Sequence, residues 1–194
     1  GWWWSSSSSS TSSVDCSHSR FASAAPPSPV DSLNLPVPGR VRRLAADRRP
    51  ALAAFDRVRD RHTLVCKRFE RPPDRAALDD ALRGAPAFEA AVTGVDLFRA
   101  PPRGAAPVVY LTVESPGLRA LHDRLVERFG AVAGLEGEAY VPHVTLARGG
   151  SVERAERLVG PVERVEWTVS ELLARVGQRP EPVRSVPLPT ARRL

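Results

Sequence analysis

The chain has 194 residues, 42% of them hydrophobic and 26% charged, proportions that are typical of a soluble globular protein. This length fits one domain of roughly 150 residues with a tail, and it is too short for two ordinary domains. No apolar run approaches the ~20 residues that a membrane-spanning helix needs, so we expect no membrane contact. The net charge of +6 favours an anionic partner such as nucleic acid. An arginine-rich solvated surface would give the same charge, so charge alone does not show whether the protein binds an anionic partner.

Cysteine and carboxylate patterns indicate no metal and no disulfide framework. Cys16 and Cys66 are too few, and too far apart in sequence, for a disulfide scaffold or a zinc site. No cluster of carboxylates is spaced to bind a cation. We therefore expect a reduced, cytoplasmic compartment, no metal ion and no cofactor.

Residues 1–31 differ in composition from the rest of the chain. They begin Gly-Trp-Trp-Trp, run through six consecutive serines at 5–10 and continue with Ser, Ala and Pro. Such a segment cannot bury enough apolar surface to offset the entropy lost on ordering. We predict a disordered low-complexity tail over residues 1–31 and a folded domain over residues 32–194.

From residue 32 onward, strand-like and helix-like patterns alternate. Apolar alternation or short apolar runs predict strands at 33–37, 62–69, 88–98, 108–114, 141–148, 162–173 and 183–188. Helical spacing of apolar residues predicts helices over 41–55, 74–83, 115–129 and 151–159. The order is neither a strict βαβ alternation nor a run of hairpins, so the fold class is α+β with antiparallel or mixed sheets.

Local signals mark several helix ends. Pro50 is expected to kink or split the first helix. Ser115 followed by Pro116 is a good helix start, with serine as the cap and proline in the first turn. Gly84 and Gly130 follow the last apolar residues of their helices and are expected to end them.

Four histidines are present, and two of them stand out. His18 lies in the predicted tail, and His122 borders the apolar face of a predicted helix, where a structural role is expected. His62 and His143 each begin a short apolar strand, with a hydroxyl residue within two positions. The two segments are far apart in the sequence, one in each half of the folded region.

The pattern His143-x-Thr145 has a direct chemical reading. Residues i and i+2 of a strand point to the same face, so an imidazole and a hydroxyl lie side by side. The hydroxyl can donate to a phosphoryl oxygen while the imidazole transfers a proton. A second histidine strand facing it would complete an acid–base pair, because an ordinary histidine pKa near 6.5 allows either protonation state at pH 7. The alternative is a pair of buried core histidines.

These segments together resemble a known family, the two-histidine (2H) phosphoesterase superfamily, and especially its 2′-5′ RNA ligase-like branch, the RNA 2′,3′-cyclic phosphodiesterases. The resemblance rests on Leu33-Asn34-Leu35-Pro36-Val37-Pro38, Arg61-His62-Thr63-Leu64, Pro107-Val108-Val109-Tyr110-Leu111, Leu118-Arg119-Ala120-Leu121-His122 and Pro142-His143-Val144-Thr145-Leu146-Ala147-Arg148. It covers about residues 32–188. It implies two pseudo-symmetric lobes, each a sheet with helices on its outer face, and an active-site cleft between them.

The resemblance also implies an activity and roles for particular residues. His62 and His143 would act as general acid and base in metal-independent hydrolysis of a 2′,3′-cyclic phosphate at the end of an RNA or a nucleotide. Thr145 would hold a non-bridging phosphate oxygen. Tyr110 and Phe98 could stack on a base or belong to the core. We expect a monomer.

The first histidine motif departs from the family pattern. The family has His-x-Thr or His-x-Ser, whereas here the hydroxyl residue follows His62 directly, as Thr63, and Leu64 takes the i+2 position. Strand alternation would turn Thr63 away from His62 unless a bulge re-aims it. Arg68 or Arg148 could otherwise replace the missing phosphate contact.

Three rival functions remain open at this point. The same two histidines would serve the reverse reaction, 2′-5′ RNA ligation. A non-catalytic RNA-binding protein could retain the cleft for recognition, with tight and salt-sensitive binding. A phosphodiesterase for a small cyclic nucleotide or an ADP-ribose cyclic phosphate would prefer the mononucleotide to RNA.

Overall fold

The computed structural model describes residues 30–177 and 181–189. Its elements are β1 (Ser32–Leu35), α1 (Gly39–Ala46), α2 (Arg49–Leu52), β2 (Arg57–Val58), β3 (Leu64–Arg68), α3 (Arg75–Leu82), β4 (Phe88–Phe98), β5 (Val108–Glu114), α4 (Pro116–Phe129), a 3-10 turn (Gly137–Ala139), β6 (His143–Arg148), α5 (Val152–Glu156), β7 (Gly160–Val169), β8 (Glu171–Arg175) and β9 (Arg184–Pro187). No helix in the described part of the chain is long and apolar enough to cross a membrane.

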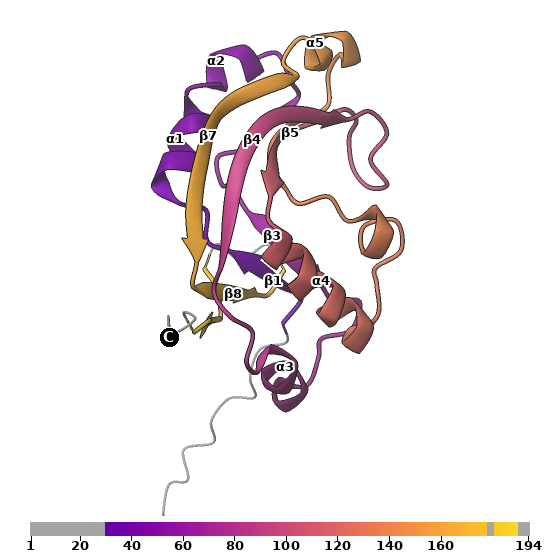
Figure 1. The fold of residues 1–194 in the computed structure, drawn as a ribbon. Helices are drawn as coiled ribbons and strands as arrows, with labels where there is room; N and C mark the ends of the chain where they lie inside the picture. Colours follow the sequence, from indigo (N-terminus) through magenta and orange to yellow (C-terminus); the bar gives the residue numbers. More distant parts are fainter. Residues whose placement is uncertain (1–29, 178–180, 190–194) are drawn as a thin grey trace, which may run out of the picture.

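The strands form one sheet of nine, in the order β7-β4-β5-β6-β3-β1-β8-β9, with β2 paired to β6. The pairings that define this order are all antiparallel. The α+β class is therefore confirmed, and the sheet is antiparallel. Figure 1 shows the long curved strands β7 and β4 beside each other, with α4 crossing the sheet near β3 and β1.

The sheet consists of two similar halves, whose matching strands β3 and β6 meet at one residue pair. One half is β3-β1-β8-β9 and the other is β6-β5-β4-β7, and β3 joins β6 through the single pair Leu64 and Val144. In the first half β1 pairs with β3 in the same register in which β5 pairs with β6 in the second half. Leu35 lies opposite Leu64 in the first half, as Leu111 lies opposite Val144 in the second.

The same irregularity occurs at the same place in each half. On β3 the ladder to β1 skips one residue between Val65 and Lys67. On β6 the ladder to β5 skips one residue between Thr145 and Ala147. β3 and β6 are thus related by a pseudo-twofold axis that passes through the pair of Leu64 and Val144. The two predicted pseudo-symmetric lobes are confirmed, and they are fused into one sheet.

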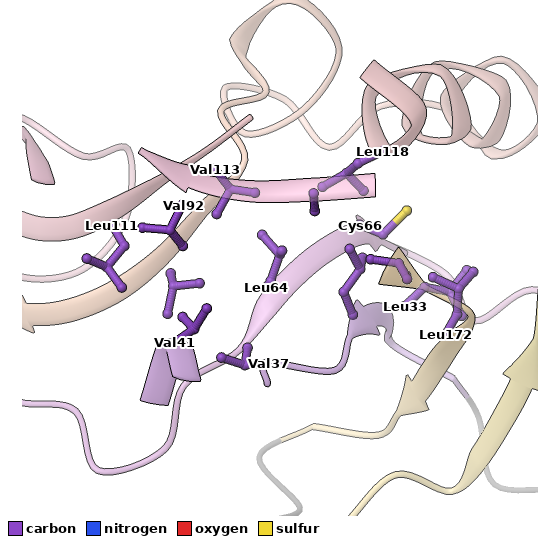
Figure 2. Close-up of a cluster of buried hydrophobic side chains, with 14 of the residues drawn as sticks. Leu33, Val37, Val41, Leu64, Cys66, Val92, Leu111, Val113, Leu118 and Leu172 are labelled. Atoms are coloured by element: carbon purple, nitrogen blue, oxygen red, sulfur yellow. The ribbon is translucent and has the colours of Figure 1, made fainter. Parts of the chain in front are cut away.

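One hydrophobic core runs beneath both halves. Leu33 and Leu64 from the first half and Leu111 from the second belong to the same buried cluster, to which α1 adds Val41 and α4 adds Leu118 (Figure 2). α4 packs against both β4 and β3, so it covers the join between the halves. The helices on this face leave the other face of β3 and β6 for the site.

Several predicted elements are confirmed to the residue, and others are wrong. The strands at 88–98 and 108–114 and the helix ending at Phe129 are as predicted, and the first helix is split just before Pro50. Ser115 caps α4 by accepting a hydrogen bond from the Leu118 amide at 3.1 Å. The predicted strand at 162–173 is instead two strands, β7 and β8, which are separated at Ser170.

The expected tail at residues 1–31 lies almost wholly outside the described residues. Of that range only Val30 and Asp31 are described, and both are tied to the domain. Val30 packs against the core, and the Asp31 amide donates to the Arg175 carbonyl at 2.8 Å. The end of the predicted domain, residues 190–194, also lies outside the described part.

Candidate functional site

A cavity of about 550 Å³ opens where β3 and β6 meet. It brings together the predicted catalytic and phosphate-binding residues, which come from segments far apart in the sequence. Its lining includes His62, Thr63, Arg68, His143, Thr145 and Arg148. Residues that the sequence did not single out complete it, among them Ser32, Asn34, Arg42, Arg59, Asp60 and Arg175.

His143 lies at the start of β6 with a defined tautomer. Its Nδ1 is 2.7 Å from the Val141 carbonyl oxygen, and because a carbonyl can only accept, Nδ1 carries the proton. In the neutral ring Nε2 is then unprotonated and can accept a proton. Burial lowers the pKa of His143, and the hydrogen bond to Val141 raises it. The positive charges of Arg68 and Arg148 lower it further. The ring is therefore neutral at pH 7.

The bulge on β6 decides which side chains reach the cavity. His143 and Thr145 alternate onto the cavity face, but Leu146 and Ala147 are both buried. The extra residue shifts the alternation by one, so that Arg148 joins His143 and Thr145 at the cavity. The matching bulge on β3 buries both Cys66 and Lys67 and places Arg68 at the cavity in the same way.

His62 does not begin a strand, which corrects the prediction of a strand over 62–69. The Arg59 amide bonds the Leu146 carbonyl at 2.8 Å, and pairing resumes only at Leu64, opposite Val144. Between these two pairings β6 has one residue, Thr145, whereas the facing segment has four, residues 60–63. A regular strand would have one residue there, so residues 60–63 form an excursion from the strand. Strand alternation does not apply within this excursion, and His62 and Thr63 both line the cavity.

The His62 ring folds back over β6. Its Nδ1 lies 3.4 Å from the Thr145 carbonyl oxygen, which again assigns the proton to Nδ1. Burial lowers the pKa of His62, the hydrogen bond to Thr145 opposes that shift, and the charges of Arg49 and Asp60 act in opposite directions.

The twofold relation shows how the first motif departs from the second. Through the pair of Leu64 and Val144, the axis relates His143 to Thr63 and Thr145 to Val65. The first half therefore has a threonine where the second has its histidine, and a valine where the second has its hydroxyl. Arg68 and Arg148 are the pair that both halves retain. His62 reaches the cavity from the position before Thr63, within the excursion.

The cavity is strongly positive. Arg42, Arg59, Arg68 and Arg148 are among its arginines, and Asp60 is the single acid among its described lining residues. Asp60 is itself paired with Arg49 at 2.8 Å. Burial and the nearby charges of Arg59 and Arg68 lower the pKa of Arg148, which remains protonated because an arginine pKa starts above 12. Such a lining favours an anion.

Tyr110 and Phe98 lie beside the His143 ring. Tyr110 is 3% exposed, its ring centroid is 4.2 Å from that of Phe98, and it lies 5.2 Å from the His143 ring. Burial and the neighbouring Asp96 raise the pKa of Tyr110 to about 12. Phe98 meets the His143 ring edge-on at 5.1 Å. Both rings pack around the imidazole.

A buried polar network holds the backbone of Arg68, one of the residues that line the cavity. Lys67 and Glu136 form an ion pair at 2.5 Å with both side chains 1% exposed, and Glu136 also accepts from the Arg68 and Val132 amides. Sequence reasoning did not find this pair, because the two residues are 69 positions apart and nothing local to either one indicates a partner.

His122 has the structural role that the sequence suggested. It is fully buried and stacks on Tyr140 with ring centroids 3.6 Å apart. Its Nδ1 donates to the Cys66 carbonyl at 2.7 Å, and its Nε2 accepts from the Gly137 amide. Within residues 30–177 and 181–189, no group of three or more His, Cys, Asp and Glu side chains is placed to hold a metal ion.

Two similar sheet halves that bring two histidines from separate segments to one arginine-lined cavity define a two-histidine phosphoesterase. The sequence pattern of the 2′-5′ RNA ligase superfamily matches residues 52–179, and the chain belongs to that superfamily. Membership assigns phosphodiester hydrolysis or ligation as the class of reaction. Among curated proteins none matches this chain in sequence.

Solved structures share the fold at low sequence identity. TT0787 of Thermus thermophilus is 20% identical with a TM-score of 0.62, over 82% of this chain and 98% of that one. A phosphoesterase is 19% identical with a TM-score of 0.56, over 84% of this chain and 99% of that one. LigT of E. coli in its apo form is 20% identical with a TM-score of 0.55, over 84% and 98% of the two chains.

Proposed function

We propose that this chain hydrolyses 2′,3′-cyclic phosphates at the end of RNA or of a nucleotide, with His143 as general base and His62 as general acid. The observation that carries the proposal is that His62, His143 and Thr145 line one cavity whose other charged groups are almost all arginines. E. coli LigT has been solved with 3′-AMP and with phosphate, ligands that combine a nucleotide and a phosphate group.

The reaction needs one proton acceptor and one proton donor. Nε2 of neutral His143 takes a proton from water as the water oxygen attacks phosphorus. The bond from phosphorus to one ribose oxygen breaks, and protonated His62 gives that oxygen a proton. The product is a ribose monophosphate with a free neighbouring hydroxyl, and a proton transfer from His143 to His62 through solvent restores the starting state.

The two rings differ in the charges around them, and the roles are assigned on the presence of an acidic neighbour at one ring alone. His143 has the arginines Arg68 and Arg148 as its charged neighbours, and both favour the neutral base. Burial lowers the pKa of His62 as well, but its charged neighbours are mixed: Arg49 and Arg42 favour the neutral ring, and Asp60 favours the protonated one. The difference follows from position, because Asp60 and His62 belong to the same four-residue excursion.

The phosphate contacts fall to Thr145, Thr63, Arg68 and Arg148. Thr145 donates to a non-bridging oxygen beside His143. Its counterpart Val65 has no hydroxyl, so Thr63 and the guanidinium of Arg68 supply the contacts on that side. Charge-assisted hydrogen bonds from arginine are about twice as strong as neutral ones and stabilise the charge that grows on the phosphoryl oxygens in the transition state. For Tyr110 we propose support of the His143 ring in place of base stacking, because Tyr110 is buried.

The test is turnover of cyclic-phosphate-ended RNA and of nucleoside 2′,3′-cyclic phosphates. His143→Ala and His62→Ala should each reduce kcat by at least about 100-fold, the usual range for loss of a general acid or base. Both variants should keep the wild-type circular dichroism spectrum. Arg154→Ala, which removes an exposed arginine on α5 outside the cavity lining, is the matched control and should keep full turnover. Wild-type turnover by either histidine variant would contradict the acid–base pair.

A binding-only function is the second candidate, and the register of the first motif favours it. Thr63 and Val65 occupy the positions where the second half has its histidine and hydroxyl, so the first half-site is altered. A binding protein would hold cyclic-phosphate-ended RNA tightly and with strong salt dependence, with no turnover by the wild-type chain. Product analysis on RNA fragments with a 5′-hydroxyl separates hydrolysis from 2′-5′ ligation.

A further inference from the structure

The short segment that leads into β6 fixes the tautomer of His143. The Val141 carbonyl accepts the Nδ1 proton of that ring at 2.7 Å, which leaves Nε2 free to take a proton. One residue earlier, the Tyr140 carbonyl accepts a hydrogen bond from the guanidinium of Arg119, at 3.0 Å from Nη2. Arg119 is an exposed residue of α4 and lies outside the described lining of the histidine cavity. An exposed arginine is thus bonded one carbonyl away from the group that holds the histidine proton.

Peptide planarity links the orientation of one carbonyl to that of the next. Because a peptide group is rigid, the Tyr140 carbonyl and the Val141 amide lie in one plane. Only the φ and ψ angles of Val141 separate that plane from the Val141 carbonyl, and the proline that follows confines Val141 to extended conformations. On the far side, the Pro142 carbonyl accepts the Val113 amide of β5 at 3.2 Å. The peptide group that binds His143 is therefore held between two hydrogen-bonded neighbours.

Arg119 is the contact that orients the Tyr140 carbonyl. The other interactions of Tyr140 involve its side chain and its amide. The hydroxyl donates to the Val65 carbonyl at 2.7 Å, and the ring stacks on His122. The amide donates to the Gly137 carbonyl at 3.0 Å. Among the hydrogen bonds of the described residues, only that of Arg119 reaches the Tyr140 carbonyl.

The segment has few anchors besides these hydrogen bonds. The Val141 side chain is 38% exposed, so packing contributes little to its orientation, and Pro142 has no N–H to donate. An open pocket of about 710 Å³ borders both Arg119 and Pro142, so water can compete for the carbonyl groups. The protein donors therefore decide which way these carbonyls point.

We propose that Arg119 is a positioning residue for His143: its hydrogen bond to the Tyr140 carbonyl holds the Val141 carbonyl where it keeps the imidazole proton on Nδ1. Without this bond the Val141 carbonyl turns away from the ring part of the time. The imidazole then adopts the other tautomer, in which Nε2 carries the proton and cannot act as a base. The inference rests on the proposed function for the role of His143 as base, whereas the tautomer itself does not depend on that function.

Loss of this positioning should also lower the pKa of His143. Burial lowers that pKa and the hydrogen bond to Val141 raises it, so a looser bond gives a lower value. Arg119 is not among the described charges that act on the ring, so its removal has no direct effect of charge. The charged and titratable groups that face the ring are those of Arg68 on β3, Arg148 on β6, Tyr110 on β5 and, across the cavity, His62.

The test compares Arg119→Met with a matched variant of the same helix. Arg119→Met removes the donor, and kcat for a nucleoside 2′,3′-cyclic phosphate should fall at least about tenfold with little change in KM. Arg119→Lys keeps a donor at the end of the side chain and should recover most of the loss. Arg124→Met is the control, because Arg124 is an exposed arginine of α4 that donates to a different carbonyl, that of Arg83, at 2.9 Å. The control should keep the wild-type kcat.

The tautomer is measured directly by ¹⁵N NMR of the imidazole, with the His143 signals assigned by comparison with His143→Gln. At a pH where the ring is neutral, the wild type should carry the proton on Nδ1, and Arg119→Met should show a share of the form protonated on Nε2. The pKa from the same titration should be lower in Arg119→Met and unchanged in Arg124→Met. A role of Arg119 in stability alone would leave both readouts unchanged, and thermal unfolding should verify that each variant is folded.

Several results would overturn the inference. A wild-type kcat or a wild-type tautomer in Arg119→Met would do so. Equal losses of kcat in Arg119→Met and Arg124→Met would also reject it, because both would then report a general change in α4. Equal losses in Arg119→Met and Arg119→Lys would show that the hydrogen bond is not the cause. If the wild type turns over no cyclic phosphate, the proposed function fails, and the NMR comparison still decides whether Arg119 sets the tautomer.

Discussion

His143 combines a fixed tautomer with two positive neighbours. The Val141 carbonyl holds the proton on Nδ1, so proton transfer falls to Nε2. Burial is the largest cause that lowers the pKa of this ring, and Arg68 and Arg148 add to it. These arginines therefore have two effects: they attract the phosphate, and they keep the base unprotonated in mildly acidic solution.

The pH profile tests that second effect. The acidic limb of kcat/KM reports the pKa of the base in the free enzyme. Because the pKa of His143 is lowered from its ordinary value of 6.5, the limb should lie below that pH. Arg148→Met removes one positive charge and keeps an apolar side chain of similar length, so the pKa should rise and the limb should move to higher pH. At pH values between the acidic limb of the wild type and that of Arg148→Met, the wild type should stay active and the variant should not.

Two comparisons make the pH result specific. Arg154→Met should leave the limb where the wild type has it, since Arg154 is exposed on α5 and absent from the cavity. High salt should move the wild-type limb toward that of Arg148→Met by screening. A limb that stays in place or moves to lower pH in Arg148→Met would show that His143 is not the titrating base.

At the scale of elements, β3 and β6 are the same structure with different sequences. Both carry a bulge that buries two consecutive residues and turns an arginine to the cavity. The twofold axis relates Thr63 to His143, yet the histidine of the first half is His62. The excursion over residues 60–63 lets the ring enter the cavity from the neighbouring position.

This relation predicts that a histidine at position 63 can replace His62. His62→Ala should lose most turnover, and His62→Ala/Thr63→His should regain at least about tenfold over it, because the transplanted acid stands at the twofold counterpart of His143. His62→Ala/Thr63→Ala is the matched control and should show no recovery. Turnover of a nucleoside 2′,3′-cyclic phosphate measures all three, and equal rates for the two double variants would reject the counterpart assignment.

The elements whose signals are local could be predicted from the sequence. β4 and β5 are long, apolar and bounded by Gly and Pro, and α4 has its cap at Ser115 and its end at Gly130. β2 was missed because Arg57-Val58 carries no strand pattern and is a strand only through pairing with β6. For the same reason the excursion before β3 could not be foreseen, since the pairing of Arg59 and Leu64 to β6 defines it.

The site shows the same division between local and non-local information. The sequence identified His62, His143 and Thr145, because a histidine beside a hydroxyl on a short strand is a pattern within one segment. It identified Arg68 and Arg148 only as substitutes, because a bulge sets their direction. Arg42 and Arg59 had no signal, since only tertiary placement brings them to the cavity.

For the whole molecule, the join between the halves is the critical structure. β3 and β6 share one residue pair, and the site lies directly over it. Three further features hold the halves together: β2, which pairs with β6, α4, which packs on both β4 and β3, and the buried pair of Lys67 on β3 with Glu136 from the second half. Glu136 accepts the Arg68 amide as well, so the same contact fixes the strand that carries a cavity arginine.

We therefore expect the Lys67–Glu136 pair to couple the stability of the two halves. Lys67→Met leaves an uncompensated buried carboxylate and should lower the free energy of unfolding by about 3–5 kcal/mol. Lys67→Met/Glu136→Gln should recover part of this loss, because a neutral amide oxygen can still accept from the Arg68 and Val132 amides. Arg83→Ala, which breaks an exposed ion pair with Asp80, should cost no more than about 1 kcal/mol. Urea denaturation followed by circular dichroism measures all three. A Lys67→Met variant no less stable than Arg83→Ala would show that the join does not depend on this pair.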